Sequence, residues 1–111
     1  MPDPIPTKSM FAGALHSSFR LFYQPDQCLE LENQCLVLEL VALNEGPSSP
    51  RQEAFSLIFT GPGQVILPQH IYPFEHDQMG CFELFIVPTG RNERGVQYEA
   101  VFNRLLTQGG Y

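Results

Sequence analysis

Two glutamates, Glu83 and Glu99, form the pattern in this sequence with the clearest catalytic potential. Each lies in an alternating apolar segment, and pairing the two segments as antiparallel strands makes the two positions diagonal neighbours, about 7–8 Å apart. Paired carboxylates at such a separation suit general acid–base catalysis, as in glycoside hydrolysis. The alternative, in which both glutamates simply point into water, is favoured because the sequence contains no tryptophan to stack against a sugar.

Cys81 and His76 are the second catalytic candidate, because they flank a predicted tight turn. A histidine within hydrogen-bond reach can activate a thiol as a nucleophile. No third residue that would orient the pair is evident, and a single cysteine at the start of a strand more often serves as a small apolar residue. We therefore assign no catalytic residue and keep a hydrolase that uses Glu83/Glu99 or Cys81/His76 as an alternative.

The three histidines, His16, His70 and His76, are the candidate metal ligands. No H-x-H, H-E-x-x-H or C-x-x-C spacing joins them to a second ligand. His70 and His76 are an even number of residues apart and can share a strand face, although Pro73 between them interrupts regular alternation. We predict no metal and no cofactor, and whether His70 and His76 form a site stays open.

Short alternating segments separated by turn residues predict the elements that position these side chains. The segment 64–76 contains two prolines, which favour an edge strand or a strand followed by irregular chain. The pattern is typical of an all-β single domain, either an antiparallel β-sandwich or a partly open barrel of about six or seven strands. The other predicted strands are 19–23, 28–32, 35–44 (central, with two apolar faces), 53–60, 81–88 and 96–102.

The last two predicted strands form a hairpin with two different faces. Its even-numbered residues are apolar and face the core, in a register that sets Leu84 opposite Ala100. Its odd-numbered residues make a mixed outer face, on which the same register sets Phe85 opposite Glu99. Because β domains associate through exposed strand faces and edges, we predict these outer residues as an interaction surface. They are Phe85, Val87, Gln97, Glu99 and Val101.

The remaining segments complete the expected organisation. Residues 1–10 form a proline-rich extended arm, because alternating prolines exclude helix and central strand. Ser9 is the predicted N-cap of a short N-terminal helical turn. Residues 11–106 form the single β domain, with a polar hairpin loop over 89–95, and residues 107–111 form a flexible tail.

Composition and charge limit the classes of partner. The 111 residues carry a formal net charge of −6, and the six basic residues are scattered. No cluster can neutralise several phosphates, so we expect neither nucleic acid nor an anionic membrane as a partner. Three cysteines without framework spacing, and a start without a signal-peptide pattern, predict a cytoplasmic protein. The low charged fraction of 16% favours a protein partner or self-association.

Several motifs carry a resemblance to one family. The sequence resembles a family of short, functionally uncharacterised bacterial β domains, whose members show FxLxFxGP, LPQxxY, EHxxxG and YEAVFN motifs. The resemblance implies a bacterial source and an all-β domain, and it brings no catalytic residue. His70 departs from the family pattern, in which glycine is more frequent. The motifs correspond here to Phe55–Pro62, Leu67–Tyr72, Glu75–Gly80, Phe82–Pro88 and Tyr98–Asn103.

These observations favour a non-enzymatic structural or protein-interaction module. We expect a small oligomeric or accessory subunit of a larger bacterial assembly, because no coherent catalytic set is present and the outer face of the hairpin is half apolar. One alternative is a β-barrel that binds a small apolar molecule among its phenylalanine and tyrosine side chains. The other is the hydrolase described above.

Overall fold

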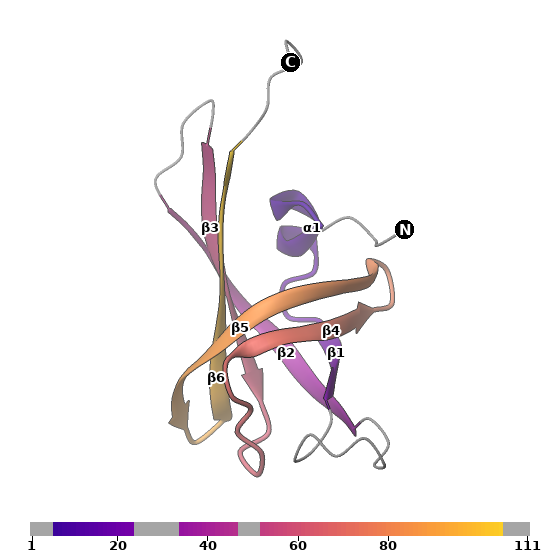
Figure 1. Cartoon of the computed structure of the whole chain (residues 1–111), viewed down its shortest axis with the longest axis vertical. Coiled ribbons are helices and arrows are strands. Elements are labelled where there is room, and N and C mark those ends of the chain that lie inside the picture. The colour runs from indigo at the N-terminus through magenta and orange to yellow at the C-terminus, as the bar shows by residue number, and fades with distance from the viewer. Residues whose placement is uncertain (1–5, 24–33, 47–51, 106–111) are drawn as a thin grey trace.

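The computed structural model describes residues 6–23, 34–46 and 52–105, and it confirms an all-β domain. Within these residues, six antiparallel strands and one short helix form a barrel in the order β1-β2-β3-β6-β5-β4 (Figure 1). Of the two expected architectures the barrel is observed, with the sheet closed rather than partly open. The elements are α1 (Lys8–Gly13), β1 (Ser18–Tyr23), β2 (Gln34–Glu45), β3 (Gln52–Gly61), β4 (His70–His76), β5 (Gly80–Asn92) and β6 (Gly95–Leu105).

Some of the expected organisation lies outside the described residues, namely the predicted strand 28–32 and the tail 107–111. The described part of the expected arm 1–10 differs from the prediction, because Pro6 is buried and α1 begins at Lys8. The end of the arm is therefore helical and packed on the barrel instead of extended.

Alternation of apolar side chains explains why the other predicted strands form. In β1, Phe19 and Leu21 are fully buried. The predicted two-sided burial of the central strand 35–44 is wrong, since β2 buries only one face and leaves Val37 52% exposed. A single-layered barrel has only one inner face, so even its longest apolar strand keeps one side toward solvent.

Strand β4 closes the barrel with a very short seam. It pairs with β5 along its whole length, but with β1 only at Arg20–Glu75 and Leu21–Phe74. Pro73 lies just outside this seam, where its missing N–H costs no ladder hydrogen bond to β1. Neither alternative predicted for 64–76 is observed. β4 pairs on both sides and is not an edge strand, and the irregular chain precedes the strand, which begins at His70.

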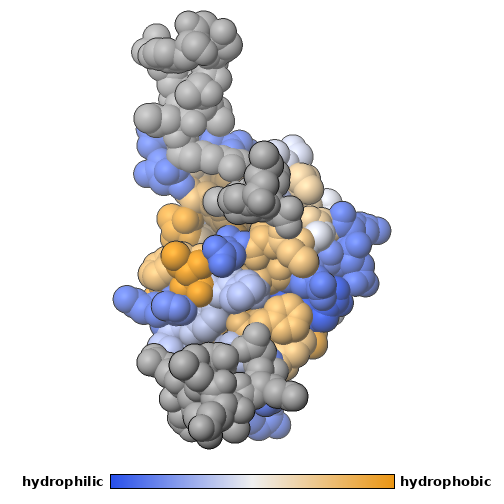
Figure 2. Space-filling model, turned by 45° about the vertical axis from the view of Figure 1, so that its right-hand side comes forward, coloured by the Kyte–Doolittle hydropathy of each residue, from blue (hydrophilic) through white to orange (hydrophobic). Residues whose placement is uncertain are grey.

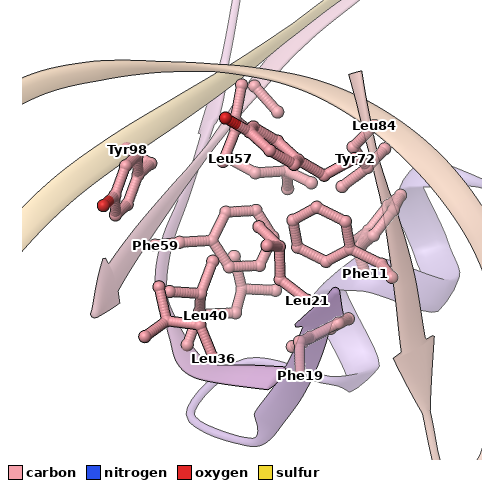
Figure 3. Packing of buried hydrophobic residues seen from close by; sticks show 14 of the residues in the cluster. Phe11, Phe19, Leu21, Leu36, Leu40, Leu57, Phe59, Tyr72, Leu84 and Tyr98 are labelled. Carbon is pink, nitrogen blue, oxygen red and sulfur yellow. The ribbon is translucent and has the colours of Figure 1, made fainter. Parts of the chain in front are cut away.

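Helix α1 fills a gap between β5 and β6. These strands pair only from Val87–Glu99 to Asn92–Gly95, and β5 then follows β4 away from β6, leaving α1 between the two hairpins (Figure 1). Phe11 of α1 is fully buried, with its ring 5.7 Å from that of Phe102 and 5.8 Å from that of Phe82. Its ring points into the barrel interior, among other buried side chains (Figure 3). Phe11 thus contacts both β5 and β6 where these two strands no longer pair with each other.

The irregular segment 62–69 crosses the other end of the barrel. Leu67 is buried, and its backbone N–H donates a hydrogen bond to Tyr98 Oη at 3.1 Å. Tyr72 Oη donates to the Pro68 carbonyl at 2.7 Å. Burial raises the pKa of Tyr98 above its ordinary value, so the phenol keeps its proton. Two tyrosines therefore anchor a segment that has no sheet pairing of its own.

The N-cap of α1 is Thr7, not the predicted Ser9, since the Thr7 hydroxyl accepts a hydrogen bond from the Met10 N–H at 3.2 Å. A helix of this length is not stable alone, so its cap and the packing of Phe11 must hold it. We expect Thr7→Ala to lower the free energy of unfolding by about 1 kcal/mol. Urea unfolding followed by circular dichroism measures this, with Ser9→Ala as the matched control. Equal losses in the two variants would contradict the assignment of the cap.

Candidate functional site

The hairpin of β5 and β6 has the predicted faces but not the predicted register. Val87 lies opposite Glu99 and Pro88 opposite Tyr98, a shift of two residues from the expected pairing. Because side chains alternate with a period of two, the shift keeps every residue on its predicted face. The inner residues Phe82, Leu84, Ile86, Val96, Tyr98 and Ala100 are buried, as expected.

The predicted loop over 89–95 is also wrong. The strands continue to Asn92 and Gly95, which leaves a two-residue turn at Glu93 and Arg94. The Asn92 side chain accepts a hydrogen bond from the Arg94 N–H at 2.8 Å, and Gly95 has a φ of +135°. A bulge after Pro88 takes up the extra residue. Polar residues that suggested a loop are therefore exposed strand positions.

The register separates the two glutamates of the acid–base hypothesis. Glu83 lies opposite Pro73 of β4, whereas Glu99 lies opposite Val87, four residues further along β5. Four residues of strand span about 13 Å, which exceeds the roughly 5–9.5 Å between carboxyl groups in glycosidases. The pairing that motivated this catalytic pair is therefore absent.

Cys81 and His76 lie on opposite faces of the sheet. Cys81 is exposed and pairs with Glu75, whose Oε2 is 3.8 Å from the Cys81 Sγ. His76 is buried and faces the barrel interior, where its ring contacts Phe19. A strand does not bring residues of opposite faces within hydrogen-bond reach, so the Cys–His pair does not form.

The hydrogen bonds of His76 give it a structural role that the sequence did not indicate. Its Nδ1 accepts from the N–H groups of Gln78 and Met79, at 3.1 and 3.3 Å. Its Nε2 is 2.9 Å from the Ser17 hydroxyl, which donates to the Ala14 carbonyl. This geometry assigns the proton to Nε2, which donates to Ser17. His76 thus connects the β4–β5 turn to the chain after α1.

The histidines do not come together as metal ligands. In the described part of the chain, no three His, Cys, Asp or Glu side chains converge on a possible metal position. His16 has a left-handed φ of 68° and lies 3.8 Å from a Glu39 carboxylate oxygen, while His70 packs edge-on against the ring of Tyr72. His70 is exposed and His76 buried, so the two do not form a shared site.

Exposed apolar side chains gather on the outer face of β4, β5 and β6. Ile71 and Phe85 lie directly opposite each other and are 52% and 51% exposed. Val87 follows Phe85 on the same face and is half-buried, and Val101 on β6 is 69% exposed. Figure 2 shows hydrophobic residues exposed across the middle of one face of the molecule, next to hydrophilic ones. We call Ile71, Phe85, Val87 and Val101 the outer patch.

The outer patch contains three of the five predicted interaction residues, and the other two, Gln97 and Glu99, lie beside it on β6. Ile71 was not among the predicted residues. The two prolines near Ile71 concealed its strand from the pattern, although alternation with the buried Tyr72 would have placed it on the outer face.

A comparison with family models identifies the chain. The model described as "Domain of unknown function (DUF6916)" matches residues 6–102. The chain belongs to this family. The DUF6916 match includes α1, β1 to β5 and most of β6, so both the barrel and the outer patch lie within it. Neither the curated proteins nor the solved structures contain a match. Among the described residues of this DUF6916 domain, no helix is long and apolar enough to cross a membrane.

Among the described residues of the DUF6916 domain, the ion pairs lie outside the outer patch. Arg20 binds Glu75 and Asp77, each at 2.8 Å, across the short β1–β4 seam. The hydrogen bond to Glu75 raises the pKa of Arg20, with Asp77 adding to the effect. Lys8 of α1 binds Glu45 at the end of β2, and this contact lowers the pKa of the Glu45 carboxyl. These exposed pairs hold the seam and the helix in register, and each contributes little to stability.

Proposed function

We propose that this protein is a non-enzymatic interaction module, an accessory subunit that binds a protein partner through the outer patch. The observation that carries the proposal is the direct cross-strand pairing of Ile71 and Phe85 with about half of each side chain exposed. Aromatic side chains, phenylalanine included, are enriched in the buried centres of protein interfaces relative to the rest of the surface. Val87 extends the apolar surface along β5, and the exposed Val101 lies on β6 two residues beyond Glu99, where the pairing of β5 with β6 has ended.

The interior of the barrel supports an interaction role over the small-molecule alternative. Phe11, Phe19, Phe59, Phe74 and Phe82 are all buried there, with the centroids of neighbouring rings 5.3–6.4 Å apart. Barrels of this size are filled by their own side chains. The catalytic alternatives have lost their geometric basis, because both candidate pairs are separated. The outer patch is therefore a better candidate binding site than the barrel interior, which its own side chains fill.

Replacing Phe85 with serine is expected to weaken partner binding about 10- to 30-fold, because truncation of a central aromatic anchor costs roughly 2 kcal/mol at interfaces. The measurement combines light scattering after size exclusion with capture of bound protein from a lysate of the host cell. Val37→Ser is the matched control, since Val37 is equally exposed at 52% but lies on β2.

The proposal expects wild type and Val37→Ser to form the same complex with equal affinity, and Phe85→Ser to form it about 10- to 30-fold more weakly. A strict monomer that binds no protein, or a complex that survives in Phe85→Ser, would contradict the proposal. Both substitutions are at exposed positions, so the free energy of unfolding should change by no more than about 0.5 kcal/mol in either variant.

A further inference from the structure

Carboxylates border the outer patch, and they have no ion-pair partner among the described residues. Glu83 is exposed on β5, two residues before Phe85, and Glu99 lies on β6 directly opposite Val87. The ion pairs in the described ranges use Glu39, Glu45, Glu75 and Asp77 instead. The outer patch is thus an apolar surface with an unpaired negative charge on either side.

The strand segments that carry the outer patch contain no basic residue to neutralise its carboxylates. No lysine or arginine occurs in 70–76, in 80–88 or in 96–103. Lys8 and Arg20 bind carboxylates elsewhere, and the Arg91 guanidinium donates to the Gly63 carbonyl at 2.8 Å. A second copy docked through the same face would bring more carboxylates and no lysine or arginine of these segments to the contact, which disfavours association.

We infer that the partner is a different protein whose binding segment combines lysine or arginine with apolar side chains. This inference rests on the proposed function and adds the chemistry of the partner. Glu83 is about 7 Å from Phe85 along β5, and Glu99 is about 5 Å from Val87 across the strands. The apolar side chains of Phe85 and Val87 therefore each have a carboxylate close by. The net charge of −6 steers a cationic segment toward the protein.

The test is a selection of random 12-residue peptides against the immobilised full chain. The enriched peptides are then titrated by fluorescence anisotropy against wild type and variants at low and high salt. We expect enriched peptides to combine basic and apolar residues. The double variant Glu83→Gln/Glu99→Gln should lose about 3- to 10-fold in affinity, because exposed ion pairs are each worth under about 1 kcal/mol. Glu93→Gln in the exposed hairpin turn removes a charge away from the outer patch and should leave affinity unchanged.

The other outcomes separate this inference from the proposed function. Peptides without a charge bias, bound by wild type but not by Phe85→Ser, would overturn the cationic partner while the outer patch stays the interaction surface. A dimer of the free protein that Phe85→Ser dissociates would do the same, because the occupant would then be a second copy. An equal loss of binding free energy per removed charge in Glu93→Gln and in the double variant would show attraction by net charge alone and overturn the inference. Binding that no outer-patch variant affects would overturn both proposals.

Discussion

Replacing Phe11 with alanine is expected to lower the free energy of unfolding by about 3–5 kcal/mol. Phe11 is fully buried, and its ring contacts those of Phe19, Phe55, Phe82 and Phe102 on four different strands. The substitution removes the ring that contacts both β5 and β6 beyond the end of their pairing. Because α1 is short, it depends on this contact, and we expect the helix to detach in the variant.

Urea unfolding followed by circular dichroism measures this loss. Met10→Ala is the matched control on the same helix, since Met10 is 43% exposed and should change stability by about 0.5 kcal/mol or less. Phe11→Leu keeps most of the volume and should cost less than the alanine variant. A loss below about 1 kcal/mol in Phe11→Ala would contradict the role of α1 as the element that fills the opening between β5 and β6.

Gly95→Ala is expected to destabilise the barrel by about 3 kcal/mol or more, because backbone strain and a steric clash act together. Gly95 has a φ of +135°, which side-chain-bearing residues rarely adopt, and an added Cβ would lie 1.9 Å from the Gly61 carbonyl oxygen. Gly61 pairs with Val96 at the end of the β3–β6 ladder, and Gly95 is the residue just before Val96. Gly95, the first residue of β6, thus permits the close approach of the end of β3.

Thermal unfolding of Gly95→Ala and of Gly90→Ala gives the comparison. Gly90 has no atom within 4 Å of an added Cβ and no positive φ, so its variant should unfold near the wild-type temperature. For a domain of this size, a loss of about 3 kcal/mol corresponds to a decrease in Tm of roughly 10 °C or more. Similar Tm values for the two variants would refute the close approach at Gly95.

The sequence predicted the strands and faces of the hairpin because both follow from local alternation. Phe85 and Val101 are exposed, while Leu84 and Tyr98 are buried, as the period of two requires. Register does not follow from alternation, since a shift of two residues leaves every face unchanged. The bulge after Pro88 fixes the observed register, and nothing in the local pattern identifies it.

Contacts between distant segments were the other limit of prediction. The hydrogen bond between His76 and Ser17 joins residues 59 positions apart, so local patterns do not reveal it. The separation of Glu83 from Glu99 follows from register in the same way. Ile71 lay in a segment whose prolines masked its alternation, and its pairing with Phe85 appeared only once β4 was placed beside β5.

The outer patch is the surface on which the account of function depends, and amide chemical-shift mapping tests it most directly. The isotope-labelled protein is titrated with a peptide from the selection described above. We predict shifts concentrated at Ile71, at Phe85 to Val87 and at Glu99 to Val101, with Val37 and the turn at Glu93 unchanged. Shifts centred on the barrel interior or on the hairpin turn, with none at Phe85, would contradict an interaction role for the outer patch.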